Sequence, residues 1–283
     1  MVINQGLYFR RRLANTTFIV LSLSAAVFGL IWLTFILWEL LANGVAALGP
    51  HLFRESTPPP GTPGGLANAI FGSVVMSLGA VLLGTPIGIF AGTYLAEYAR
   101  YGKLAFVVRF VNDILLSAPS IVIGLFVYAI AVATVGGFSG FAGSLALTLI
   151  AVPVVMRTTE NMLRLVPGSL REAAFALGAP RWKVSLSVTL RAARSGVITG
   201  LLLAVARISG ETAPLLFTAL NNQFFNADMS EPMANLPVVI FQFAMSPYDN
   251  WIRLAWGGAL LITMAVLLLN IIARVFFRDR QSG

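Results

Sequence analysis

The sequence predicts an all-α membrane protein with six membrane-spanning helices. The first observation behind this prediction is the composition: of 283 residues, 58% are hydrophobic and only 11% are charged, whereas a soluble domain has about 25% charged residues. The second is a series of apolar runs of roughly 20 residues, the length that a helix needs to cross a bilayer. The third is the clustering of lysine and arginine in alternate connections between those runs.

The predicted spans follow the apolar runs in order. The first run is too long for a cleaved signal peptide, so we expect it to remain as an anchor. The Gly136-Gly137 pair predicts a tight turn between the third and fourth spans. The predicted spans are residues 13–40, 66–96, 115–135, 141–156 with an amphipathic extension, 195–220 and 251–275.

Lysine and arginine set the expected orientation. With six spans, only Arg54 and Arg253 fall on one side of the membrane, while Arg207 lies inside a span. All the other basic residues fall on the opposite side, which the positive-inside rule assigns to the cytoplasm together with both termini. These residues are Arg10, Arg11, Arg12, Arg100, Lys103, Arg109, Arg157, Arg164, Arg171, Arg181, Lys183, Arg191, Arg194, Arg274, Arg278 and Arg280.

This orientation divides the chain into a cytoplasmic tail at residues 1–12 and a transmembrane domain at 13–283. The domain has predicted outer loops at 41–65 and 221–250 and a predicted cytoplasmic loop at 157–194. Within the first outer loop, proline and glycine at 56–65 predict an extended segment rather than a helix. The second outer loop carries three acidic residues and no basic ones, which suits either a docking surface for an outside partner or a solvated loop.

Composition also excludes several kinds of chemistry. The absence of cysteine excludes disulfides and thiolate catalysis, and a single histidine, His51, argues against a histidine-based metal site. No G-x-x-x-x-G-K-[ST] sequence occurs, so we expect no ATP or other cofactor on this chain, and any ATPase must be a separate subunit. The net charge of +8 is mainly a topology signal. Anionic lipid is a secondary expectation, and we expect no nucleic acid partner.

The predicted cytoplasmic loop contains a short helix. Ser169 and Glu172 have the spacing of a capping box, which predicts a helix start there. Gly178, followed by Ala-Pro, predicts its end, so we expect a helix over 170–177. Several alanines leave one side of this helix with little bulk, which would suit docking in a groove of another protein. The plainer alternative is that Glu172 only caps the helix and the alanines only favour helix formation.

Glu172, Ala173 and Ala174, followed by Gly178, resemble the EAA loop of ABC importer permeases. The resemblance implies a coupling helix that docks on a cytoplasmic ATPase. The family usually has Ile-x-Leu-Pro nine residues further on, whereas this chain has Arg191 at the proline position. This departure puts the turn into the fifth span in doubt, but not the docking role.

Two charged residues lie deep in the fifth predicted span. Arg207 is twelve residues into it, about 18 Å along a helix and near the middle of the bilayer, and Glu211 follows at the i,i+4 spacing that allows a pair. Pro214 cannot donate to the carbonyl of Gly210, so a kink is expected there, with Thr212 as a possible donor to the freed carbonyl. The pair either holds helices together or forms part of a substrate pathway, where an arginine suits a tetrahedral oxyanion.

A second polar group opens the third predicted span. Asp113, Ser117 and Ser120 are possible pathway residues there. The structural alternative is that Asp113 caps a helix start and Pro119 lies in a first turn. On the second span, glycine and serine at positions 72, 73, 77, 79, 84 and 88 predict close helix packing, which would suit a partner permease.

Nearly the whole chain resembles the A-type permease subunits of bacterial phosphate-specific ABC importers, most clearly at residues 57–70, 90–100, 110–130, 157–178 and 206–224. The resemblance implies a type I ABC importer permease fold in the bacterial inner membrane and inorganic phosphate as substrate. It also implies a homologous C-type permease subunit, a cytoplasmic ATPase dimer that binds ATP and Mg²⁺, and a periplasmic phosphate-binding protein. The alternatives are a permease for another oxyanion, such as sulfate or molybdate, and a secondary transporter or channel without an ATPase.

Overall fold

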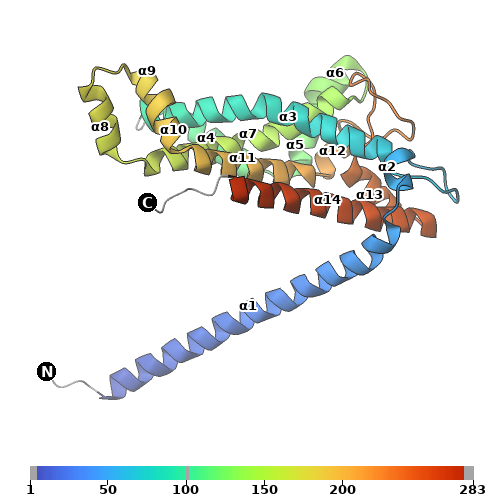
Figure 1. The fold of residues 1–283 in the computed structure, drawn as a ribbon, viewed down its shortest axis with the longest axis horizontal. Coiled ribbons are helices and arrows are strands. Elements are labelled where there is room, and N and C mark those ends of the chain that lie inside the picture. The colour runs from blue at the N-terminus through green and yellow to red at the C-terminus, as the bar shows by residue number, and fades with distance from the viewer. Residues whose placement is uncertain (1–4, 100–101, 277–283) are drawn as a thin grey trace.

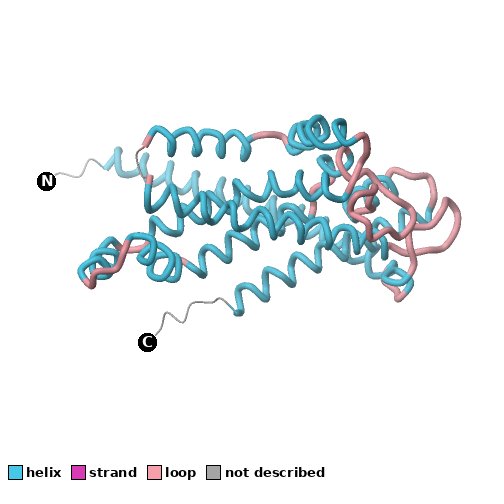
Figure 2. The backbone as a smooth tube through the Cα atoms, turned by 90° about the horizontal axis from the view of Figure 1, so that it is seen from above, coloured by secondary structure: helices cyan, strands magenta, loops and turns pink. Residues whose placement is uncertain are grey.

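The computed structural model describes residues 5–99 and 102–276, and all regular elements among them are helices. This confirms the predicted all-α class. The helices form an elongated bundle, with α8 at one end and most long loops at the other (Figures 1 and 2). Residues 1–4 of the predicted tail, Arg100, Arg278 and Arg280 lie outside the described residues, as does the side chain of Arg274.

Four of the predicted spans are single long helices. Each is long and apolar enough to cross a membrane. They are α1 (Gln5–Ala47), α3 (Ala67–Thr93) with its π-helical extension η1 (Tyr94–Tyr98), α7 (Gly140–Leu165) and α14 (Asp249–Phe276).

The third span differs from the prediction because it starts earlier and is bent. Helix α4 (Lys103–Ser117) is followed, after a bend of 107°, by a segment made of α5 (Ser120–Val127), η2 (Tyr128–Val132) and α6 (Ala133–Val135). Pro119 explains the bend, since a proline forces the preceding residue out of helical geometry and Ala118 is extended. The predicted start at 115 is wrong because charged residues suggested a connection over 103–109, whereas Arg109 is satisfied by Glu160 of α7.

The fifth span is the other bent one. A helical segment over 181–192, made of α9 (Arg181–Lys183), η3 (Val184–Thr189) and α10 (Leu190–Ala192), meets α11 (Arg194–Ser209) at 73°. The turn into α11 therefore forms at Ala193 even though Arg191 replaces the family's proline. The short α12 (Ala213–Leu216) follows. Six crossings result when each bent pair counts as one.

Helices α3 and α7 form the centre of the bundle. The predicted close packing on α3 is confirmed within this chain: Gly79, Gly84 and Gly88 lie against α7, and Gly72 lies against Met233 and Ala234. A Cβ at Gly88 would lie 2.7 Å from Cβ of Val155, and one at Gly79 would lie 2.9 Å from Oγ of Ser144. Glycine is needed because any side chain at these positions would separate the two helices. Gly136 provides the predicted turn before α7 with a φ of 85°.

Helix α1 lies mostly away from the bundle (Figure 1). No residue in its most apolar 18-residue stretch is buried. Only its last turns contact α14, where a Cβ at Gly44 would lie 2.7 Å from Cβ of Leu260. The apolar surface of α1 therefore belongs to a membrane-spanning helix that gains little from the packing of this chain.

The outer-loop predictions are partly corrected. The extended segment at 56–65 is confirmed and is held against α14, where Trp251 Nε1 donates to the carbonyl of Pro58 at 3.2 Å. The predicted loop 221–250 contains α13 (Leu236–Ala244), whose apolar residues are buried in a core with α2 (His51–Arg54), α3 and α14. The solvated-loop interpretation is therefore wrong for 236–244, because this segment has enough apolar side chains to join the core.

Candidate functional site

Arg207 and Glu211 lie on the two sides of the point where α11 ends. Nε of Arg207 is 3.8 Å from Oε1 of Glu211, and the side chains are 40% and 14% exposed. The predicted pairing is confirmed, although 3.8 Å is too long for a hydrogen bond. The guanidinium makes no hydrogen bond within the part of the chain that the structure describes, so its N–H groups remain available to a ligand.

The predicted kink is a complete break. Helix α11 ends at Ser209, Gly210 follows as its C-cap, and Pro214 lies in the first turn of α12. Glu211 is thus beyond the helix rather than one turn further along it. The predicted bond from Thr212 is wrong for the described residues: its hydroxyl donates no hydrogen bond there, and its carbonyl accepts from the amides of α12 instead.

The second polar group has a different arrangement from the one predicted. Asp113 lies inside α4, so it does not cap a helix start, and its Oδ1 is 3.8 Å from Nη1 of Arg157 on α7. The Ser117 hydroxyl donates to the carbonyl of Ile114 at 3.0 Å. Ser120 begins α5, with Pro119 as its N-cap rather than in its first turn. The Ser117 hydroxyl is therefore occupied by its own helix, whereas the Asp113 carboxylate is 56% exposed and is not held by a hydrogen bond from Arg157.

The fold brings the two chain breaks together. A Cβ at Gly124 of α5 would lie 2.6 Å from Cα of Pro214 in α12. The apolar residues beside both breaks belong to one cluster: Ile208 and Leu215 are among its buried members, and Leu116 and Ala118 pack against it. The two breaks are therefore in direct packing contact.

The short helix of the cytoplasmic loop is α8 (Gly168–Ala176), at the left end of the bundle in Figure 1. The predicted capping box is wrong, because the helix begins at Gly168 after Pro167 and has no side-chain cap. The predicted end is confirmed: Gly178 has a φ of 79°, and the amides of Gly178 and Ala179 close the helix. No α8 residue is buried, so Glu172, Ala173 and Ala174 are accessible to a partner.

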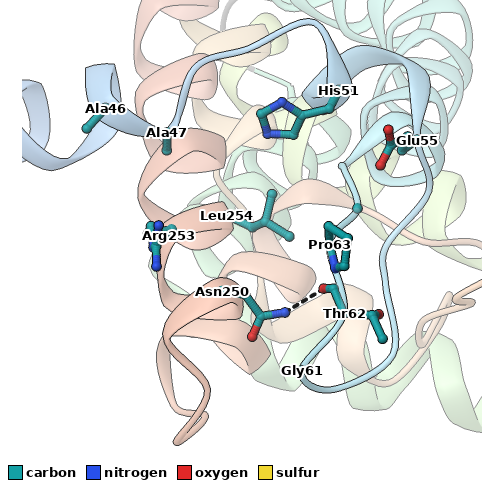
Figure 3. A pocket seen from close by; sticks show the side chains of 11 residues that line it. Ala46, Ala47, His51, Glu55, Gly61, Thr62, Pro63, Asn250, Arg253 and Leu254 are labelled. Atoms are coloured by element: carbon teal, nitrogen blue, oxygen red, sulfur yellow. Dashed lines mark hydrogen bonds between the residues drawn. The ribbon is translucent and has the colours of Figure 1, made fainter.

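A cavity of about 420 Å³ lies at the other end of the molecule, between the end of α1, the extended segment and α14 (Figure 3). His51, Glu55 and Arg253 contribute its ionisable side chains. Asn250 Nδ2 donates to the carbonyl of Thr62 at 2.7 Å and so holds one wall. This cavity lies at the end opposite α8.

Comparison with known proteins identifies the family. The family described as "Binding-protein-dependent transport system inner membrane component" matches residues 84–278. The chain belongs to this family. Among relatives of this transport-permease family, the chain is 60% identical to the phosphate transport system permease protein PstA of Pasteurella multocida over 272 residues, which cover 96% of this chain and 97% of that protein. It is 55% identical to the same-named protein of Haemophilus influenzae over 99% of this chain and 100% of that protein.

Solved structures show the permease fold at much lower identity. A chain of a bacterial alginate ABC transporter, in complex with an alginate-bound periplasmic protein, matches with a TM-score of 0.65 and 14% identity and covers 97% of this chain and 99% of its own length. A chain of the inward-facing MetNI methionine ABC transporter matches with a TM-score of 0.63 and 20% identity over 75% of this chain and 94% of its own length. Our chain thus has the fold of ABC importer permeases.

Two sets of ion pairs in this transport permease were not predicted from the sequence. Glu160 of α7 is 1% exposed, and its Oε1 accepts from Arg109 Nε at 2.7 Å and from Arg164 Nη2 at 2.5 Å. Arg171 of α8 pairs with Glu97 of η1 at 2.7 Å. The i,i+4 spacing of Glu160 and Arg164 was the available signal for the first group, whereas no local pattern marks the second.

Proposed function

We propose that this chain is the membrane-spanning permease subunit of an ATP-driven importer that moves inorganic phosphate across the bacterial inner membrane. The observation that carries the proposal is the loosely paired, part-exposed Arg207 at the break of α11. It occurs in a chain that is similar over almost its whole length to phosphate transport permeases.

The geometry at Arg207 suits an oxyanion. The guanidinium is always charged and presents its N–H groups as a fork that matches two oxygens of a tetrahedral anion. At 3.8 Å, Glu211 is near enough to hold the arginine in place electrostatically and too distant to occupy its donors. We propose that Glu211 retains Arg207 when the path is empty and that Gly210, Thr212 and Pro214 keep this part of the backbone out of helical geometry. Asp113, Ser117 and Ser120 remain candidates for a secondary part of the path.

The proposed assembly contains four kinds of subunit. This chain pairs with a homologous permease, a cytoplasmic ATPase dimer supplies ATP and Mg²⁺ chemistry, and a periplasmic phosphate-binding protein delivers the substrate. The exposed α8, with Glu172, Ala173, Ala174 and the Gly178 turn, is the proposed ATPase contact. Exposed apolar side chains support this role: Leu170 and Phe175 of α8 are exposed, and Leu177, directly after the helix, is 89% exposed.

The proposed orientation has both termini in the cytoplasm. The Gln5 end of α1, the Phe276 end of α14 and α8 lie at the same end of the molecule (Figure 1), which supports it. In the proposed cycle, ATP binding closes the ATPase dimer and displaces α8, and the bundle then opens outward to accept phosphate. Hydrolysis resets the bundle.

Transport by reconstituted vesicles tests the proposal. The complete complex is placed in proteoliposomes with labelled phosphate, and uptake is measured with and without ATP and the binding protein. We expect uptake only with both. Uptake of phosphate by this chain alone along an ion gradient would instead show a secondary transporter, and ATP-dependent uptake of sulfate or molybdate without phosphate would show a permease for another oxyanion.

A further inference from the structure

Arg171 of α8 forms a two-pronged ion pair with Glu97. Nη2 of Arg171 lies 2.7 Å from Oε1 of Glu97, and Nε lies 3.1 Å from Oε2. The two side chains are 17% and 8% exposed, so water competes little for either group. A planar guanidinium that donates to both oxygens of a carboxylate fixes the orientation of the two groups as well as their distance.

The same guanidinium also binds the end of α7. Nη2 donates to the carbonyl of Leu163 and Nη1 to the carbonyl of Val166, both at 2.7 Å. The last carbonyls of a helix have no partner within it and carry partial negative charge, so a cation there is stabilising. Arg171 therefore joins three segments at one point: α8, the end of α7, and η1.

Segment η1 is in turn bound to α4. Arg109 of α4 donates from Nη2 to the carbonyl of Leu95 in η1 at 3.1 Å and from Nε to Glu160 of α7. Because η1 continues α3, and α3 packs closely on α7 along its glycines, these contacts connect α8 to the centre of the bundle. They also reach α4, which leads to the break beside α12.

Helix α8 has two other connections to the bundle. The covalent one passes through Gly178, where a Cβ would meet nothing within 4 Å, and then through residues 179–193, of which Val184, Ser185, Thr189 and Ala193 are buried. Helix α8 also packs against η3 in this stretch. The Arg171–Glu97 pair differs from both connections because it fixes the orientation of α8 relative to η1 and the end of α7.

We propose that the Arg171–Glu97 pair is a brace that makes α8, η1 and the end of α7 move as one body. A displacement of α8 then reaches α3 and α7 directly through side-chain contacts, in addition to the route along the chain into α11. This inference rests on the proposed function, in which an ATPase displaces α8. Arg171 and Glu97 are positioning residues and do not contact the transported anion.

Replacing Arg171 by lysine distinguishes the orienting effect of the guanidinium from the effect of its positive charge. Arg171 makes bonds from three of its nitrogens toward two carboxylate oxygens and two carbonyls. Lysine keeps the charge but has a single nitrogen, so it cannot hold all these acceptors at once. The matched control is Arg181→Lys, the same change in the same loop at an exposed position with no ion pair in the described part of the chain.

Distance measurements between spin labels test the brace. The chain has no cysteine, so Ser169→Cys on α8 and Phe90→Cys on α3 give one unique pair of exposed sites. The complete complex is assembled with cysteine-free variants of the other subunits, and the distance is measured without nucleotide and with ATP held unhydrolysed. We expect the same distance in both states for the parent and for Arg181→Lys. For Arg171→Lys we expect a distance that shifts and broadens with ATP.

Two outcomes overturn the brace: a parent distance that changes with ATP as much as that of Arg171→Lys, or an Arg171→Lys distance as constant as the parent's. If Arg171→Lys does not assemble, Glu97→Gln provides the same comparison from the other side, with the same expected shift. Phosphate uptake by the labelled parent is measured in the same vesicles. If the labelled parent transports another anion but its label distance is the same with and without ATP, the proposed substrate is wrong and the brace is still supported.

Discussion

Nε of Arg207 lies 3.8 Å from Oε1 of Glu211, across the residue at which α11 ends. An unbroken helix would keep these two residues in a fixed i,i+4 relationship. Here α11 ends at Gly210, which lies between the two residues, and Pro214 follows them in the next helix. The separation of Arg207 and Glu211 therefore depends on the conformation of the break. The pair is therefore placed to change its geometry when α11 and α12 move.

Replacing Arg207 by glutamine tests its part in the path. We expect Arg207→Gln to abolish ATP-dependent uptake while the complex still assembles, because an amide keeps the bulk but offers no permanent charge to an oxyanion. Uptake and co-purification of all subunits are the measurements. Arg191→Gln, which removes an exposed charge outside the bundle, is the control. Retained uptake would exclude an essential role, and loss of the complex would favour a role in holding helices together.

Gly178 and Gly136 form a matched pair for testing the coupling helix. Both have a positive φ, 79° and 85°, and a Cβ at either would meet nothing within 4 Å. A side chain at either position therefore costs about 1–2 kcal/mol through backbone strain alone. We expect Gly178→Trp to reduce ATPase attachment or stimulation while membrane insertion is unchanged, and Gly136→Trp to leave both intact. Equal effects of the two changes would mean that strain, not docking, is responsible.

The glycines of α3 predict a stability effect. At Gly88 an added Cβ would lie 2.7 Å from Cβ of Val155 and 3.1 Å from the amide nitrogen of Met156. Gly88→Val should therefore force α3 and α7 apart and destabilise the protein by about 1–3 kcal/mol, the usual effect of overpacking. Gly29→Val on α1, where nothing lies within 4 Å, should have little effect. Thermal unfolding in detergent measures both, and similar melting temperatures for the two variants would contradict the packing.

Removing the carboxylates of Glu160 and Asp113 compares the stability contributions of a buried and an exposed ion pair. Glu160 is 1% exposed and accepts from two arginines that are 21% and 43% exposed, so Glu160→Gln should destabilise the protein by about 1–3 kcal/mol, the usual loss when hydrogen bonds to a charged group are weakened. Asp113 is 56% exposed and 3.8 Å from Arg157, so Asp113→Asn should change stability by about 0–1 kcal/mol. Denaturant titration of both variants measures the difference. A Glu160→Gln variant as stable as Asp113→Asn would show that the network contributes little.

The sequence by itself determined the features that depend on neighbouring residues. Long apolar runs define the spans because a helix must satisfy its own backbone in lipid, and the glycine at 178 and the proline at 214 end or break helices through their own covalent geometry. The Arg207–Glu211 pair was predictable for the same reason, since both residues lie within one turn.

The tertiary structure alone decided the features that join distant residues. It made 103–117 a helix of the third span, because Arg109 finds Glu160 fifty-one positions away. It made the second half of a predicted loop the packed helix α13, and it placed α7 against Gly79, Gly84 and Gly88 of α3. It also placed Arg171 beside Glu97, seventy-four positions away. A local pattern specifies which side chains need a partner, but only the packing of the helices brings that partner within reach.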